Sequence, residues 1–354
     1  MSNLITRDDL GFIEAAYCPQ QYLGLSLFGY RFRLLVSRSR RQKMTGTRIA
    51  MILLHHESAW ERRAVKGVLA SLLNAFSPEE PPMIDLFSAE YSKVRLEEEI
   101  MPAIAQRKSE YIAVITCGSW VSTQVQEIIT QRSMGITQLF LGVPHPVRTG
   151  LIRSFEIPQE GIVGVNTAPL NYELCVESLK TLLPQVQTVL IPTDLAFAGA
   201  GSELDKKYLL RALEKNGLTG RMLAINSDED LVSQIGGHLG GVDVLWSLCE
   251  PGLQINARKI SKMCEEYSVV FCASDLASVF QGADIGWGDS GSLSGAYAGQ
   301  ICFALAMGVP AIEIKNVEAV TQQTMRTNPA FFERMEMEEK SRVLVENIVP
   351  LGWE

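Results

Sequence analysis

The sequence lacks paired cysteine motifs, long apolar runs and any excess of basic residues. Its seven cysteines are an odd number without a CxxC spacing, which argues against a disulfide framework and against a zinc site. No apolar run is long enough to cross a bilayer. The net charge of −8 gives no reason to expect nucleic acid as a partner. Catalytic triads and phosphate-binding loops are also missing. We therefore expect a protein that is not an enzyme and that uses no metal or cofactor.

The first 45 residues fit neither a secretory signal nor a clear structural element. Asp8, Asp9 and Glu14 precede the apolar part, which Pro19 interrupts, and the basic residues come after it. We interpret residues 1–45 as an N-terminal extension. Together with the unpaired cysteines, this segment favours a cytoplasmic protein.

Apolar runs of strand length alternate with amphipathic segments through most of the remaining chain. This alternation predicts an α/β fold with parallel sheets and helices on both faces. The pattern restarts near residue 166, and a chain of 354 residues is too long for one growing core. We therefore expect two lobes. The last expected strand is PAIEI, residues 310–314.

The segment from Val242 to Asp275 reads as one parallel βαβ unit, with polar residues where both strands stop. Ligands of open α/β sheets bind outside the carboxyl ends of the strands, so residues at these ends are the candidate site. Carboxylates and small polar groups there suit a ligand amine or hydroxyl. Asp275 fits an alternative role as the cap of the next helix. The polar candidates at strand ends or near the lobe crossing are Asn166, Asp194, Glu250, Ser274, Asp275 and Asp289.

Aromatic residues and a helix start occupy similar positions. Trp60, Trp120 and Trp287 all follow expected strands, where their rings can stack on a planar ligand. Gly118 and Ser119 open a helix whose free N–H groups favour an anion, although Ser119 could serve only as an N-cap.

Two adjacent histidines follow the first strand. We expect His55 to contact the ligand and His56 to be solvated. A metal site needs a third convergent ligand, and none stands at a useful spacing.

Three segments resemble the ABC transporter solute-binding proteins that include the tryptophan- and tyrosine-binding lipoproteins. They are FLGVPHPVRTGLIRSFEIPQEGIVGV (140–165), the βαβ unit, and GADIGWGDSGSLSGAYAGQICFALAMGVPA (282–311). The resemblance implies a type I periplasmic-binding fold with two Rossmann-like lobes and a ligand cleft between them. It assigns residues 46–165 plus 278–308 to lobe one and residues 166–277 plus 309–354 to lobe two.

The same resemblance implies a function and further site residues. The chain would be a monomeric solute-binding protein that closes by hinge motion on a small, aromatic or amino-acid-like ligand. Its partner would be an ABC transporter permease, and its location the periplasm or cell envelope. His145 stands where the family has a turn Asp, and Glu250 stands where it has Asp. Two alternatives stay open: a cytosolic ligand sensor of the same fold, and a racemase or isomerase that uses Cys117 and Cys272.

Overall fold

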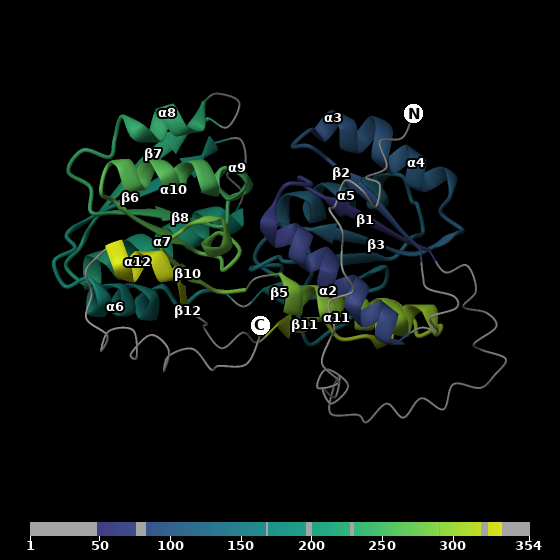
Figure 1. The fold of residues 1–354 in the computed structure, drawn as a ribbon. Coiled ribbons are helices and arrows are strands. Elements are labelled where there is room, and N and C mark those ends of the chain that lie inside the picture. The colour runs from purple at the N-terminus through teal and green to yellow at the C-terminus, as the bar shows by residue number, and fades with distance from the viewer. Residues whose placement is uncertain are drawn as a thin grey trace.

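The protein forms two α/β lobes that lie side by side (Figure 1). Each lobe is built on a six-stranded sheet, as expected from the alternating pattern. The computed structural model describes residues 48–75, 83–167, 169–195, 200–226, 230–289, 291–319 and 325–334. The predicted extension, residues 1–45, lies outside the described residues.

The first sheet is entirely parallel, with strand order β11-β5-β4-β3-β1-β2. Its strands are β1 (Arg48–Leu53), β2 (Met83–Ser88), β3 (Tyr111–Cys117), β4 (Gln138–Leu141), β5 (Ile162–Thr167) and β11 (Val317–Ala319). Its helical segments are α2 (Ala59–Ala75), α3 (Lys93–Arg95), η4 (Leu96–Ile100), α4 (Met101–Gln106), α5 (Ser119–Gln131), α11 (Ser292–Ala306) and η7 (Ala311–Glu313).

The second sheet has the order β12-β10-β9-β8-β6-β7 and is parallel except for β12, which runs antiparallel to β10. Its strands are β6 (Thr188–Asp194), β7 (Thr219–Ile225), β8 (Val244–Ser247), β9 (Val270–Ala273), β10 (Ile285–Trp287) and β12 (Met325–Thr327). Its helical segments are α6 (Tyr172–Leu182), α7 (Ala200–Lys215), α8 (Leu231–Gly236), α9 (Pro251–Ile255), α10 (Ala257–Glu266), η6 (Val279–Gln281) and α12 (Pro329–Arg334).

The continuous apolar strands are explained by cores on both faces of each sheet. In β1, the odd-numbered residues from Ile49 to Leu53 pack in the core beneath α2 and α11. The even-numbered residues from Ala50 to Leu54 pack beneath η4, α4 and α5. Successive strand side chains point to opposite faces, so a strand covered on both sides needs apolar residues at every position.

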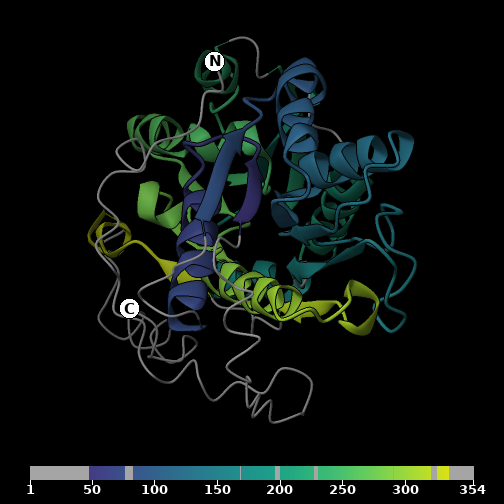
Figure 2. The ribbon, with the colours of Figure 1, turned by 90° about the vertical axis from the view of Figure 1, so that its right-hand side faces the viewer.

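Helices α2 and α11 lie directly against each other on one face of the first sheet (Figure 2). Glycines on both helices make this close approach possible. A Cβ atom on Gly295 would lie 2.1 Å from the carbonyl oxygen of Ala64, and one on Gly67 would lie 2.1 Å from that of Ser292. The backbones of the two helices are therefore in contact, which a larger side chain at either glycine would prevent.

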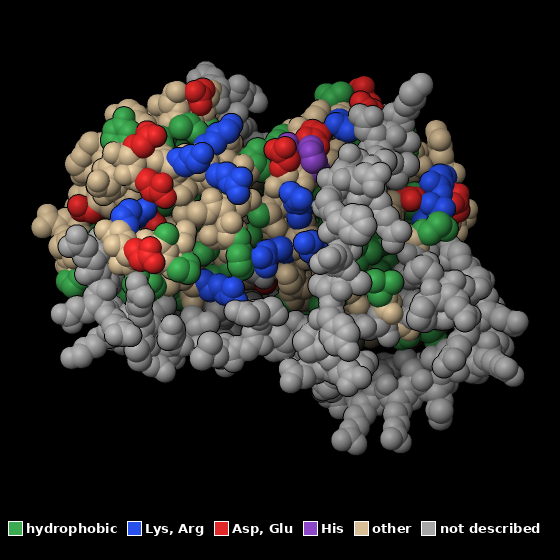
Figure 3. Space-filling model, viewed as in Figure 1, with side chains coloured by type: hydrophobic (Ala, Val, Ile, Leu, Met, Phe, Trp, Pro, Cys, Tyr) green, Lys and Arg blue, Asp and Glu red, His purple; other side chains and the backbone are tan. Residues whose placement is uncertain are grey.

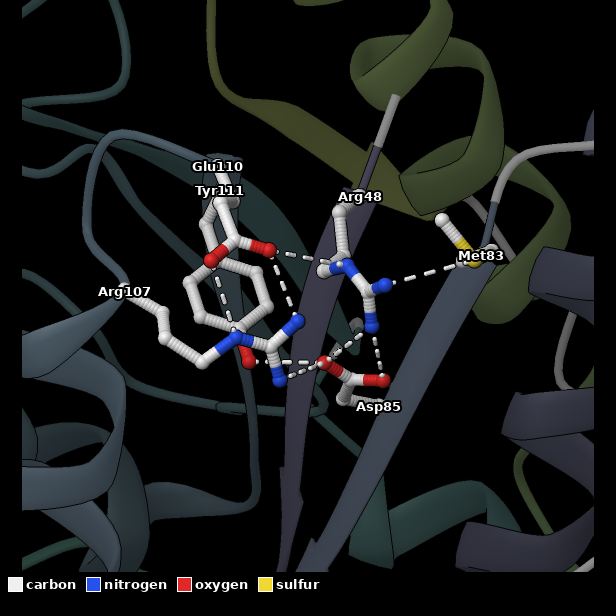
Figure 4. Close-up of polar contacts among 6 residues, drawn as sticks. All are labelled: Arg48, Met83, Asp85, Arg107, Glu110 and Tyr111. Carbon is white, nitrogen blue, oxygen red and sulfur yellow. Dashed lines mark hydrogen bonds and ion pairs between the residues drawn. The ribbon is translucent and has the colours of Figure 1, made fainter. Parts of the chain in front are cut away.

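An ion-pair network closes the amino end of the first sheet (Figure 4). The buried carboxylate of Asp85 accepts hydrogen bonds from Arg48 at 2.9 Å, from Arg107 at 3.3 Å and from the Tyr111 hydroxyl at 2.7 Å. Asp85 lies in the edge strand β2, and its partners come from the adjacent β1, from the start of β3 beyond it and from the turn before β3. The carboxylate is thus neutralised and hydrogen-bonded, as a buried charge requires.

Sheet membership differs from the predicted lobe boundaries in two places. Strand β10 pairs with β9 in the second sheet, although residues 278–308 were assigned to lobe one. Strand β11 pairs with β5 in the first sheet, although residues 309–354 were assigned to lobe two. The chain therefore passes between the sheets after β5, after β10 and again after β11.

The strand expected at residues 310–314 is wrong. This segment contains the short 3₁₀ turn η7, in which the Glu313 N–H donates to the Pro310 carbonyl. Pro310 has no N–H to donate to a strand ladder, and the exposed Ile312 has no core to enter.

Candidate ligand cavity

A cavity of about 450 Å³ lies between the two lobes. Its walls contain the residues just beyond β1, β2 and β3 in the first sheet and beyond β8 and β9 in the second. The segments that connect the sheets, around Pro169 and Gly288, complete it. The cavity therefore lies where the carboxyl ends of parallel strands from both sheets meet, the position at which such sheets bind ligands.

The start of α2 forms one part of the first wall. The Ser58 hydroxyl caps this helix by accepting the N–H of Glu61 at 3.3 Å. Both carboxylate oxygens of Glu61 in turn accept backbone N–H groups, from Leu54 at 2.9 Å and from His55 at 3.0 Å. Burial nevertheless raises the pKa of Glu61 to about 8, because a dry environment disfavours the charged form.

Trp60 forms a rigid part of the same wall. A Cβ atom on Gly142, which follows β4, would lie 2.1 Å from Cη2 of the indole. Gly142 also has φ +69°, a left-handed conformation that strains other residues. The glycine therefore allows the ring to pack against the backbone, with the indole at the cavity.

Helix α5 begins at the cavity with Gly118 as its N-cap, at φ 79°. No side chain caps the helix, so Ser119 is its first residue rather than its cap. This part of the wall retains the N–H groups of a helix start, which favour negative charge.

The second wall centres on Glu250, which is buried at the N-cap of α9. Its Oε2 accepts the Asp194 N–H at 2.6 Å, and its Oε1 accepts the Ser202 hydroxyl at 2.5 Å. Lys206 lies 3.5 Å from Oε1 and is not part of the cavity lining. Burial raises the pKa of Glu250, although the two hydrogen bonds and the charge of Lys206 act to lower it.

Eight of the predicted ligand-binding residues line this cavity. Five come from the first lobe, and three come from the second lobe or the segment after β10: His55, Trp60, Gly118, Ser119, Trp120, Glu250, Ser274 and Asp289. Their roles as ligand contacts stay predictions.

Five other predicted residues do not line the cavity. Trp287 stacks on Trp246 in the core of the second lobe, with ring centroids 4.7 Å apart. Asp275 caps the following turn, because its carboxylate accepts both the N–H and the hydroxyl of Ser278. This is the alternative role that the sequence left open.

The remaining three are buried beside the cavity or between the lobes. Asp194 is fully buried in β6 and donates its N–H to Glu250. Asn166 is buried in β5, and its Oδ1 has no hydrogen-bond partner among the residues that the structure describes. His145 instead faces Asp205 of the other lobe, with Nε2 3.4 Å from Oδ1.

Several lining residues escaped the prediction: Glu61, Tyr91, Tyr172, Asp205 and Gln254. Glu61 stands three residues after Ser58, a capping-box spacing that marks the helix start but not the cavity. Tyr91 has a positive φ of 59°, which nothing in its residue type suggests. Asp205 comes from α7 rather than from a strand end, so the carboxyl-end rule does not reach it.

His55 and His56 meet a third polar group that the sequence did not reveal. Glu90 lies 2.9 Å from His55 Nε2 and 2.7 Å from His56 Nδ1, and the three ligand atoms fall within 4.8 Å of one another. The Glu57 N–H donates to His55 Nδ1 at 3.2 Å, which places the proton of a neutral His55 on Nε2. A metal ion bound to Nε2 would shift the proton of His55 to Nδ1. A proton there would displace the Glu57 N–H, which now donates to Nδ1. The cluster is therefore arranged as hydrogen-bonded pairs, although its residue types suit a divalent cation.

The two thiols considered for racemase chemistry are inaccessible. Cys117 and Cys272 are fully buried, and neither lines the cavity. Burial raises the pKa of both thiols well above the ordinary value. Such thiols are poor nucleophiles, since the thiolate is the reactive form.

Contacts between the lobes border the cavity. Besides the His145–Asp205 pair, Arg148 donates to the Tyr208 hydroxyl at 2.6 Å. On another side, the Arg63 guanidinium lies 3.6 Å above the Phe280 ring, which Arg326 also approaches. Lys and Arg side chains gather on the outer face along the junction of the lobes (Figure 3). Among the described residues, polar and cation–π contacts thus join the two lobes.

Known structures share this two-lobed arrangement. An ABC domain from Streptococcus pneumonia in complex with L-Trp matches with TM-score 0.71 and 14% identity, over 84% of this chain and 97% of that one. A solute binding protein from Bacillus halodurans with bound myo-inositol matches with TM-score 0.57 and 13% identity, over 82% and 97%. The trehalose repressor from Escherichia coli matches with TM-score 0.55 and 11% identity, over 80% and 100%.

These likenesses confirm the predicted type I periplasmic-binding fold. A search of curated proteins finds no match. Among the described residues, no helix has the length and apolar character needed to span a bilayer. A family profile described as ABC transporter substrate binding protein matches residues 52–348, which is most of the chain. With the cavity between two parallel sheets, this match means that the chain belongs to the family of ABC transporter substrate-binding proteins.

Proposed function

We propose that this protein binds a small ligand in the cavity between its lobes and delivers it to an ABC transporter permease. The observation that carries the proposal is the origin of the cavity walls. They come from the carboxyl ends of strands in both sheets and from the segments that join the sheets. A rotation of one lobe against the other would therefore open or close the cavity, as hinge-closing binding proteins do.

The contacts across the cleft support closure by a hinge. His145–Asp205 and Arg148–Tyr208 join the two lobes through a few polar groups at the cavity border. Such contacts can form and break at low cost, whereas a shared apolar core could not. A ligand that touches both walls would favour the closed form by its differential affinity.

Aromatic walls support a ligand with a planar or apolar part. Trp60, Trp120, Tyr91 and Tyr172 line the cavity together with Leu170 and Leu248. Aromatic side chains contribute large buried areas and stack on planar groups.

The test is a thermal-shift screen of aromatic amines, amino acids, polyols and purines against the full chain. Trp120→Ala should abolish the stabilisation by any true ligand, because Trp120 lines the cavity. Tyr267→Ala is the matched control, since Tyr267 is an exposed aromatic outside the cavity lining. A ligand whose stabilisation survives Trp120→Ala and is lost in Tyr267→Ala would place the site elsewhere.

The permease partner and an extracytoplasmic location are part of the same proposal, because the family serves ABC transporters. Fractionation of the native host should recover the protein with the cell envelope, and crosslinking should recover a permease. Strictly cytosolic recovery would instead support the alternative of a ligand sensor.

A further inference from the structure

The described residues that line the cavity carry acidic side chains and no lysine or arginine. The acidic residues are Glu61, Asp205, Glu250 and Asp289, and His55 is the one basic type among them. A zwitterionic or anionic ligand ordinarily meets an Arg or Lys that pairs with its negative group. The described lining offers none.

The four acidic groups reach the cavity from separate parts of the fold. Glu61 lies in the first turn of α2, Asp205 in α7, Glu250 before α9, and Asp289 after β10. Both lobes and a connecting segment therefore contribute acidic side chains. A ligand enclosed between the lobes would face them from more than one side.

Two buried carboxylates away from the cavity, Asp85 and Asp284, are paired with arginine, whereas the buried Asp275 bonds Ser278. Asp85 contacts Arg48 and Arg107. Asp284 lies 2.6 Å from Arg334. In the cavity, Asp205 faces His145 at 3.4 Å, Asp289 accepts the Ser294 hydroxyl at 2.5 Å, and Glu250 lies 3.5 Å from the buried Lys206. The described contacts of the cavity acids are thus hydroxyl, imidazole and backbone N–H donors and, at Glu250, the ammonium group of Lys206.

Aromatic rings complete the surroundings of a cation. Trp60, Trp120, Tyr91 and Tyr172 line the same cavity. The faces of aromatic rings attract organic cations, most strongly where water is excluded. An ammonium group attached to a planar or apolar body would satisfy both the carboxylates and the rings.

We propose that the ligand is an organic cation, an amine on an aromatic or apolar body with no accompanying carboxylate. This inference rests on the proposed function. A ligand carboxylate would lie among four acidic groups with no Lys or Arg in the described lining to pair with it. Wherever one of those groups is ionised, like charges at close range in a poorly solvated site repel strongly. The first turn of α5 is where such a carboxylate would have to bind, so compounds that differ only in that group provide the test.

The pH dependence gives a second readout. Glu61 is faced by His55 after β1, by Glu90 and Tyr91 after β2, and by Cys117 at the end of β3. Burial lowers the pKa of His55 and raises those of Tyr91 and Cys117, so these three are neutral near pH 8. Ionisation of Glu61 near pH 8 would therefore add negative charge to the wall, and binding of a permanent cation should tighten from pH 6.5 to 8.5.

The experiment compares matched ligands by calorimetry on the full chain. Tryptamine is set against tryptophan and tyramine against tyrosine, with myo-inositol as a neutral compound. We expect each amine to bind at least about tenfold more tightly than its amino acid. Asp205→Asn should weaken amine binding by about tenfold, whereas Glu214→Gln, an exposed position on the same helix, should leave it unchanged.

The outcomes separate the inference from the proposed function. Tighter binding of the amino acids or of inositol would overturn the inference and leave a small-ligand binding protein in place. Amine binding that is indifferent to Asp205→Asn and to pH would also overturn it. If no compound of any class binds, the proposed function fails together with the inference.

Discussion

The two ends of the first sheet treat buried acidic residues in opposite ways. At the amino end, Asp85 is held by two arginines and a tyrosine hydroxyl (Figure 4). At the carboxyl end, Glu61 is held only by backbone N–H groups, and its pKa rises to about 8. The difference teaches that burial alone does not mark a functional carboxylate. At the amino end the arginine-paired Asp85 joins neighbouring strands, whereas at the carboxyl end Glu61 lines the cavity.

The largest expected effect is on stability, from removing the Asp85 carboxylate at the amino end of the first sheet. Asp85→Ala leaves Arg48, Arg107 and Tyr111 without their shared acceptor. Removing one partner of a largely buried ion pair costs about 3 kcal/mol of unfolding free energy. Urea unfolding followed by circular dichroism measures this, and the exposed Glu98→Gln is the control. Ligand affinity per folded molecule should stay unchanged. A loss of affinity without a loss of stability would instead make Asp85 a functional residue and not a structural one.

The second effect is a pH dependence of stability that arises from Glu61 at the carboxyl end of the first sheet. The pKa of Glu61 is about 8 in the folded protein, above the ordinary value of 4.5. The folded protein therefore holds a proton that the unfolded chain releases between these values, so the stabilising contribution is lost as pH rises from 4.5 to 8. We expect Glu61→Gln to flatten the fall in melting temperature over this range. The exposed Glu57→Gln should retain the wild-type slope.

A smaller effect should follow from weakening the contacts across the cleft. His145→Ala combined with Arg148→Ala removes both polar links to α7. We expect the ligand-free protein to open, with a larger radius of gyration in small-angle scattering, and ligand to bind a few-fold more weakly. An unchanged scattering curve in both states would argue against a hinge at this border.

The smallest effect is expected at an exposed pair. Lys215 and Glu173 lie 2.7 Å apart, but both side chains are about half exposed to solvent. Water and salt screen such pairs, so Lys215→Ala should not change the urea midpoint measurably. A clear shift in the urea midpoint would mean that an exposed ion pair stabilises this protein as well. Burial would then not be needed to explain the stabilisation by Asp85.

Much of this fold could be predicted because strand and helix periods are local. The run IAMILL, residues 49–54, has the length and character of a strand and matches β1 within one residue, and Ser58 is of a residue type that caps helices and stands just before α2. The placement of β10 and β11 could not be predicted, because a three-residue strand is defined by its neighbour in the sheet rather than by its own pattern. The strand predicted at residues 310–314 was wrong for a similar reason. The apolar alternation of this segment is strand-like, but the chain forms a turn there.

The candidate site was predictable only as a region. The rule that ligands bind at carboxyl ends placed Trp60 and Glu250 correctly at the cavity. The same rule could not separate Trp60 from Trp287, because both follow strands and only packing turns Trp287 onto Trp246. Asp205 was missed because its position depends on how α7 crosses the cleft from the other lobe, and that is a long-range contact.

The glycine contact between α2 and α11 restricts which motions can accompany binding. A Cβ atom on Gly291 would lie 2.3 Å from the carbonyl oxygen of Trp60, so the segment just after Asp289 rests on the start of α2. Trp60, Glu61 and Asp289 should therefore move as one rigid unit during closure, although they are distant in the sequence. The connection after β10 is held at its α11 end, so the proposed hinge motion should bend this connection on the side of the second sheet.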